Sequence, residues 1–321
     1  MEINSICLVG GTGFVGRAVA DLASPRGMRV RVLTRFEQHA APVKVLPTVE
    51  IMLGNPYSDA DLERAFDDMD AVVNCVGILH EGGRGRTFRD AHVELPRRIA
   101  QACRKEGVQH LVHVSALGAS PDGPSNYQRS KAAGEEALRQ AAGILPWTLF
   151  RPSIIFGEGD RFLNMFADLA RIFPVIPLGR ANARMQPVWV DDVARAIVAA
   201  LGDMRTFGQT YELCGPRAYT LEELVRYAGE AVGRKPRIMP LSDSLSNLQA
   251  AVFEHLPGKV LTRDNLRSLS VDNVCGCPFP EIFGFKPTAL EAVAPEYLSG
   301  QTPRARYARF RYFAGRQRWQ R

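Results

Sequence analysis

The chain has 321 residues, of which 46% are hydrophobic and 23% charged, the balance of an ordinary folded protein. Its 40 basic residues exceed its 34 acidic ones, but seven arginines lie in residues 301–321 and leave the first 300 residues close to neutral. This composition argues against extensive disorder. Because no apolar run reaches the roughly 18 residues of a membrane-spanning helix, it also argues against an integral membrane protein.

The first residues enter an apolar run at Ile6 without a charged and apolar leader, so we expect a cytoplasmic protein. The six cysteines are scattered, four of them inside apolar patterns, and we expect them to be reduced. Cys275 and Cys277 form a Cys-Gly-Cys pair, but no second pair or nearby histidine completes a metal-ligand set. We therefore interpret the pair as structural and predict no metal site.

Short apolar runs alternate with helical periodicity through the first half of the chain. The predicted strands are 6–9, 29–33, 50–53, 71–75, 111–115 and 148–151, and the predicted crossover helices include 59–66, 91–104 and 127–140. Strands that alternate with helices predict a parallel sheet, and nearly continuous apolar strands indicate helices on both faces. The fold class is therefore α/β, a Rossmann-type doubly wound parallel sheet with a smaller C-terminal lobe.

The second half is less regular. We interpret the next segments as returns of the chain to the sheet: a strand at 187–190, a helix at 191–201 and a strand at 209–213. Thr220 and Glu223 then have the spacing of a helix capping box. We predict that residues 1–156 and 186–214 form a nucleotide-binding Rossmann domain. Residues 157–185 and 215–300 would form a substrate or partner lobe, and residues 301–321 a tail.

A glycine-rich turn follows the first strand directly and opens the first helix, the context in which such a turn binds a dinucleotide. Its glycines permit a tight turn, a close approach of backbone to the pyrophosphate, and close packing of helix on strand. The predicted pyrophosphate site comprises Gly10, Gly11, Thr12, Gly13, Phe14, Val15 and Gly16.

The second strand ends at Thr34 and Arg35, where an NAD-selective protein usually places a carboxylate for the ribose 2′-hydroxyl. A guanidinium there can bind a 2′-phosphate, which favours NADP(H) over NAD(H), and Arg17 adds a second cation. The alternative is that Arg35 is a solvated charge at a strand end. Later strand ends supply further predicted contacts: Asn55 for the adenine edge, and Val76 and Gly77 for the adenosine or nicotinamide ribose.

Tyr127 and Lys131 are four residues apart on one face of a predicted helix, and Ser115 ends a strand twelve residues upstream. These three are the predicted catalytic residues. A nearby ammonium lowers the pKa of a phenol, so Tyr127 could pass a proton while a hydride moves, and Ser115 would polarise the same carbonyl. The alternative is an ordinary surface helix, since a Tyr-x-x-x-Lys spacing is common by chance.

With these residues the chain resembles extended or atypical short-chain dehydrogenases/reductases, and within them the group related to the 39 kDa accessory subunit of respiratory complex I. The resemblance rests on the glycine turn and on residues 32–35, 74–79, 114–119, 127–131, 151–157 and 186–194. It implies bound NADP(H), with Arg151, Pro152 and Ser153 as further nucleotide contacts. In the complex I subunit the nucleotide serves structure more than turnover, and other members of the group act in ubiquinone biosynthesis.

The arginines of residues 303–321 alternate with aromatic residues. Such a segment suits an anionic membrane surface or a protein partner, and less well nucleic acid, because the rest of the chain lacks a basic excess. The remaining alternative is a tail that packs on the second lobe. A tail at a membrane would make the protein peripheral at the inner face of the cell membrane.

Three functions stay open. The first is an NADP(H)-dependent oxidoreductase that acts on a carbonyl or alcohol of a lipophilic or quinone-related small molecule. The second is a non-catalytic NADP(H)-binding protein of a respiratory or ubiquinone-biosynthesis assembly. The third, an epimerase or dehydratase with tightly held NAD, is disfavoured by Arg35.

Overall fold

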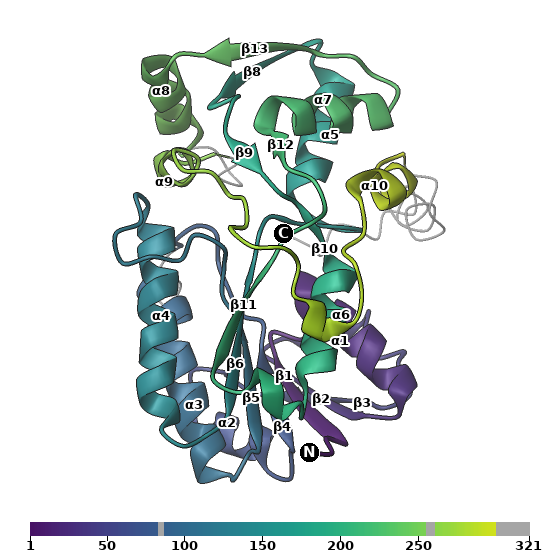
Figure 1. The fold of residues 1–321 in the computed structure, drawn as a ribbon, viewed down its shortest axis with the longest axis vertical. Helices are drawn as coiled ribbons and strands as arrows, with labels where there is room; N and C mark the ends of the chain where they lie inside the picture. Colours follow the sequence, from purple (N-terminus) through teal and green to yellow (C-terminus); the bar gives the residue numbers. More distant parts are fainter. Residues whose placement is uncertain (83–86, 255–260, 300–321) are drawn as a thin grey trace.

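A seven-stranded parallel sheet forms the centre of the computed structural model, which describes residues 1–82, 87–254 and 261–299 (Figure 1). The strands are β1 (Ser5–Val9), β2 (Arg29–Thr34), β3 (Val49–Leu53), β4 (Ala71–Asn74), β5 (His110–Val114), β6 (Trp147–Pro152) and β11 (Gln209–Leu213). Their order in the sheet is β11-β6-β5-β4-β1-β2-β3. The α/β prediction is thus confirmed.

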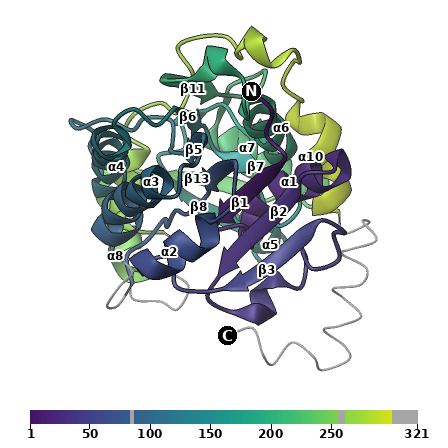
Figure 2. The same cartoon turned by 90° about the horizontal axis from the view of Figure 1, so that it is seen from below.

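Helices cover both faces of this sheet (Figure 2). They are α1 (Phe14–Ala23) and α6 (Val190–Ala200) on one face, and α2 (Asp59–Phe66), α3 (Leu95–Lys105) and α4 (Asn126–Ala142) on the other. In β1, Ile6 and Leu8 pack into the core under α1 and α6, whereas Cys7 and Val9 pack under the other three helices. Because helices cover both faces, the inner strands β1, β4 and β5 are buried along their whole length.

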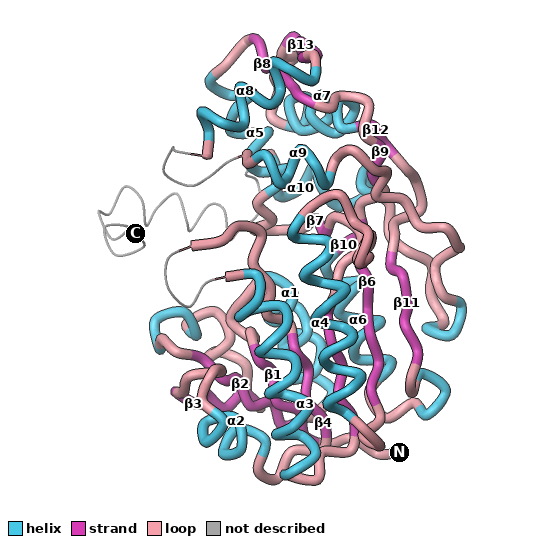
Figure 3. Tube along the Cα trace, turned by 90° about the vertical axis from the view of Figure 1, so that its left-hand side faces the viewer, coloured by secondary structure: helices cyan, strands magenta, loops and turns pink. Residues whose placement is uncertain are grey.

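The remaining elements lie beyond the carboxyl ends of the central strands (Figure 3). They comprise three small sheets, β7 (Ile155–Phe156) with β10 (Val188–Trp189), β8 (Val175–Gly179) with β13 (Arg237–Leu241), and β9 (Arg184–Met185) with β12 (Tyr219–Thr220). The helices are α5 (Phe162–Ile172), α7 (Leu221–Ala231), α8 (Asp243–Phe253), α9 (Arg263–Ser268) and α10 (Leu290–Leu298). Of these helices, α5, α7 and α10 share a third hydrophobic core with residues of the small sheets.

Local sequence signals explain several boundaries. Thr220 caps α7 in the expected capping box with Glu223, and Ser125 and Gln128 form the same motif at the start of α4. The helix expected at 91–104 instead begins as a π-helical turn, Arg89–Glu94, before it continues as α3. None of the described helices is long and apolar enough to cross a membrane.

The expectation that all six cysteines are reduced is wrong for two of them. Cys214, which follows β11, forms a disulfide with Cys275 across a separation of 61 residues. The pairing could not be predicted from the sequence, because only the fold brings residues 273–275 across the end of β11. Cys277 is an exposed free thiol, so the Cys-Gly-Cys motif does not form a pair of its own.

Candidate nucleotide-binding site

The glycine turn has the geometry that a pyrophosphate site requires. Gly10 has a φ of +84°, and the Gly13 amide donates to the Gly10 carbonyl over 2.9 Å. A Cβ at Gly16 would collide with the Gly10 carbonyl, so only glycine lets α1 start this close to β1. No side chain caps α1 at Gly13, and no acid lies in its first turn, which leaves amide donors and a positive helix end for an anion.

The end of β2 presents a cation to solvent. Arg35 is exposed, its guanidinium lies 5.5 Å from the centre of the Phe36 ring, and it forms no salt bridge within the described residues. Thr34 is buried, and its hydroxyl donates to the Phe36 carbonyl over 3.2 Å. Thr34 therefore shapes the strand end, and Arg35 stays available to a phosphate.

Asn55 is also exposed, at the end of β3. Its side-chain oxygen accepts from the Tyr57 amide over 3.1 Å, and its own amide donates to the Asp61 carboxylate over 2.8 Å. These contacts fix the turn into α2. Within the described residues, the side-chain nitrogen of Asn55 makes no hydrogen bond.

The turn after β4 lies beside the glycine turn and the predicted catalytic helix. A Cβ at Gly10 would lie 3.0 Å from the Val76 side chain. A Cβ at Gly77 would lie 3.9 Å from the Lys131 Nζ and 4.0 Å from the Nε2 of His92. The structure therefore brings together the glycine turn, Val76, Gly77 and Lys131.

Tyr127 and Lys131 occupy the first two turns of α4. Lys131 is buried and donates to the Val114 carbonyl over 3.0 Å. Burial lowers the pKa of Lys131 to about 8, although Glu135 opposes the shift. Burial also raises the pKa of Tyr127 to about 12. The expected lowering of the phenol pKa by Lys131 is therefore not observed, because the ammonium is directed at a carbonyl and burial dominates.

The structure gives Ser115 a different partner from the expected substrate carbonyl. Its hydroxyl donates to the Glu135 carboxylate over 2.6 Å. Glu135 is fully buried and also accepts from Arg151, over 2.8 and 2.7 Å, and from Arg139 over 3.0 Å. Burial alone would raise the pKa of Glu135. Hydrogen bonds from Arg151 and Ser115 outweigh burial and lower the pKa below its usual value, so the carboxylate is charged. The Ser115 hydroxyl therefore donates its hydrogen bond to the carboxylate of an ion pair inside the protein.

The nucleotide contacts implied for residues 151–153 are engaged elsewhere. The Arg151 guanidinium binds Glu135, and the Pro152 carbonyl accepts from the Leu117 amide over 2.9 Å. The Ser153 hydroxyl donates to the Asn273 side chain over 2.5 Å. In this arrangement the three residues join β6 to its neighbours, and their contact with a nucleotide stays a prediction.

His92 is the residue that the sequence analysis missed. It lies in the π-helical turn, is 2% exposed, and accepts at Nε2 from the Ile78 amide over 3.1 Å. Its ring lies edge-on to Tyr127 with centroids 5.5 Å apart. A π-helical turn has no simple sequence signature, so nothing in the pattern marked this histidine.

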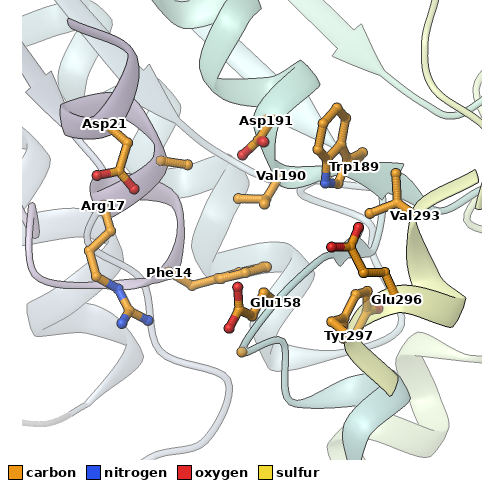
Figure 4. A pocket seen from close by; sticks show the side chains of 12 residues that line it. Phe14, Arg17, Asp21, Glu158, Trp189, Val190, Asp191, Val293, Glu296 and Tyr297 are labelled. Atoms are coloured by element: carbon orange, nitrogen blue, oxygen red, sulfur yellow. The ribbon is translucent and has the colours of Figure 1, made fainter. Parts of the chain in front are cut away.

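A cavity of about 370 Å³ lies between α1, the start of α6 and α10 (Figure 4). Phe14 and Arg17, both predicted nucleotide contacts, line it, and the Arg17 Nε donates to the Gly13 carbonyl over 3.3 Å. Four carboxylates share the lining: Asp21, Glu158, Asp191 and Glu296. These carboxylates disfavour a phosphate inside the cavity.

Comparisons with known proteins agree with this geometry. The family model described as "NAD dependent epimerase/dehydratase family" matches residues 6–214. The mouse protein "NADH dehydrogenase [ubiquinone] 1 alpha subcomplex subunit 9, mitochondrial" is 32% identical over 299 residues, which cover 90% of this chain and 78% of the relative. The "Ceramide reductase" of Caulobacter vibrioides is 30% identical, over 74% of each chain.

Solved structures share the fold. An NADPH-dependent quinone oxidoreductase from Escherichia coli, solved with NADPH, superposes with a TM-score of 0.72 at 17% identity, over 90% of this chain and 98% of that one. A nucleoside-diphosphate-sugar epimerase from Staphylococcus aureus superposes with a TM-score of 0.70 at 18% identity, over 92% and 99% of the two chains.

Proposed function

The chain belongs to the NAD dependent epimerase/dehydratase family, and we propose that it binds NADP(H) and transfers a hydride between the nicotinamide and a carbonyl or alcohol. The observation that carries the proposal is the convergence of the glycine turn, Gly77 and Lys131 at one edge of the sheet. Similarity to two reductases and to complex I subunits supports a nicotinamide nucleotide as the ligand.

The choice of NADP(H) rests on Arg35. Its exposed guanidinium ends β2, the strand next to β1, and the described residues offer it no carboxylate partner. A 2′-phosphate would supply that partner through charge-assisted hydrogen bonds. Asn55, which follows β3, carries no charge that would oppose the phosphate.

The residues around Gly77 suit the reductive direction. The bound nucleotide would supply a hydride to a substrate carbonyl carbon, whose oxygen then needs a proton. Because the pKa of Tyr127 is raised to about 12, its phenol is protonated at neutral pH and can give that proton. The Tyr127 hydroxyl makes no hydrogen bond to any described residue, so it is available to a substrate. Lys131, with a pKa of about 8, keeps a positive charge beside Gly77.

A second function is favoured by the Ser115 contact. While its hydroxyl donates to the Glu135 carboxylate, Ser115 cannot also donate to a substrate carbonyl, which removes one of the three predicted catalytic groups. The chain would then be an NADP(H)-binding accessory protein of a respiratory or ubiquinone-biosynthesis assembly. The mouse relative, named as a subunit of NADH dehydrogenase [ubiquinone], supports this alternative.

Tyr127→Phe separates the two functions. We would follow NADPH consumption with a panel of quinones and long-chain ketones, and compare Tyr211→Phe, a substitution on the distant strand β11, as the matched control. A reductase should lose turnover by roughly a hundredfold or more with Tyr127→Phe alone. Co-purified nucleotide without consumption of NADPH by the unaltered protein would refute the reductase and leave the accessory role.

We propose that residues 303–321, which lie outside the described residues, contact an anionic membrane surface or a protein complex. Their arginines and aromatic residues support this role, and it would place a cytoplasmic protein at the inner face of the membrane. Sedimentation with anionic vesicles should decrease when these residues are deleted. Unchanged sedimentation would refute the membrane contact.

A further inference from the structure

We infer that His92 is a positioning residue of the nucleotide site, which holds the turn after β4 against Tyr127. The inference rests on the proposed NADP(H) site and adds a residue to it. His92 comes from the π-helical turn Arg89–Glu94, which displaces the regular hydrogen bonding before α3. It is buried between the end of β4 and the start of α4.

The hydrogen bonds of His92 run in one direction. Because its Nε2 accepts from the Ile78 amide over 3.1 Å, its proton must lie on Nδ1. The Nδ1 lies 2.8 Å from the Ser130 Oγ and donates to it. The Ser130 hydroxyl in turn donates to the Tyr127 carbonyl over 2.7 Å. This chain of three bonds joins the turn after β4 to the first turn of α4.

The ring of His92 also supports the phenol ring. Phe88 stacks on it with centroids 5.3 Å apart, and the Tyr127 ring meets it edge-on at 5.5 Å. Phe88 contacts Tyr127 at 5.9 Å, so the three rings form one cluster. Each aromatic pair contributes stabilisation beyond its buried area, and together they restrict the Tyr127 side chain.

His92 is not placed to exchange protons. Burial, reinforced by the nearby Lys131 charge, lowers the pKa of His92 to about 3, so the imidazole is neutral near pH 7. The Ile78 amide can donate its hydrogen bond only to a neutral ring, since a protonated imidazole has no acceptor nitrogen. His92 therefore fixes geometry and leaves proton transfer to Tyr127.

The backbone of His92, like its side chain, packs directly against α4. Gly134 of α4 lies directly against the His92 carbonyl, and a Cβ at this glycine would collide with that carbonyl. Because α4 also carries Tyr127 and Lys131, His92 is fixed relative to both. Its Nε2 lies 4.0 Å from the position of a Cβ at Gly77, and we infer that the nicotinamide ribose binds there because the Lys131 Nζ lies 3.9 Å from the same position.

Two variants separate the two contributions of His92. His92→Phe keeps an aromatic ring against Phe88 and Tyr127 but leaves the Ile78 amide without an acceptor. His92→Gln loses the ring but retains a side-chain oxygen that can accept from the Ile78 amide. Both remove a buried group, so a matched control is needed for stability alone.

His110 provides that control. It is also fully buried, its pKa is lowered to about 4 by burial, and its Nε2 lies 2.9 Å from the Thr148 Oγ1. It begins β5, at the opposite end of the strand from the nucleotide site. His110→Phe therefore removes comparable interactions without touching the turn after β4.

The experiment measures the dissociation constants of NADPH and of 2′,5′-ADP, which lacks the nicotinamide half, for each folded variant. We expect His92→Phe to weaken NADPH binding by roughly tenfold, His92→Gln by less, and neither to change 2′,5′-ADP binding. His110→Phe should change neither constant. Equal NADPH affinity in all variants, or equal losses for both ligands, would overturn the inference. Failure of the unaltered protein to bind NADPH would instead overturn the proposed function, and the inference with it.

Discussion

Glu135→Gln should destabilise the protein more than any single surface substitution on α4. The Glu135 carboxylate is fully buried and accepts four hydrogen bonds, from Ser115, from two nitrogens of Arg151 and from Arg139. Breaking a buried ion pair costs about 3–5 kcal/mol. Because the two arginine side chains are 26% and 32% exposed, water can partly solvate them, and we expect about 3 kcal/mol.

Ser115→Ala removes only one of these bonds. A hydrogen bond to a charged group contributes about 1.5–3 kcal/mol, so Ser115→Ala should lower the free energy of unfolding by about 2 kcal/mol. The double variant should lose less than the sum, since both substitutions break the same contact. Urea denaturation followed by circular dichroism gives all three values.

Glu136→Gln is the matched control, because Glu136 is the next residue, is 59% exposed and lies 3.8 Å from Arg139. It should change stability by less than about 0.5 kcal/mol. Unchanged stability of Ser115→Ala, together with a large loss of turnover, would refute the reasoning. Ser115 would then serve a substrate and not Glu135.

Three further predictions concern the turn, the buried histidines and the disulfide. Gly16→Ala should abolish nucleotide binding, measured by titration, because the new Cβ collides with the glycine turn; unchanged binding would show that the turn tolerates it. Burial lowers the pKa of His92 to about 3 and of His110 to about 4, so the unfolded chain binds more protons below pH 6.5. The free energy of unfolding should therefore fall between pH 6.5 and 4, by up to about 1.4 kcal/mol per pH unit for each histidine, and a flat urea-denaturation profile would contradict this. Cys214→Ser should lower the free energy of unfolding by about 4 kcal/mol in the chain-entropy account, and a reductant should reproduce the loss; no effect of reductant would show that Cys214 and Cys275 are not bonded.

The sheet could be predicted from sequence because burial on both faces leaves a local mark. The strand at 209–213 and the helix at 59–66 agree with the structure residue for residue, and the other central strands agree to within one residue at each end. The glycine turn was equally visible, since its four glycines lie within seven residues and directly follow a predicted strand. These features depend on neighbours in the chain.

The site beyond the turn depends on contacts between distant segments, which no local pattern records. The Ser115 and Glu135 bond joins a strand end to the middle of a helix, and its only sequence sign was an acid four residues after Lys131. His92 needed the π-helical turn to face Tyr127. The phenol pKa was expected to fall because charge was weighed without burial, and burial dominates in the structure.

The most direct test of NADP(H) binding is to titrate the purified protein with NADPH and with NADH, by calorimetry, alongside Arg35→Asp. We predict saturable binding of NADPH that is roughly tenfold or more tighter than binding of NADH, and loss of that preference in Arg35→Asp. Binding of neither nucleotide, or equal affinities that Arg35→Asp leaves unchanged, would contradict the assignment of the glycine turn and Arg35 to NADP(H).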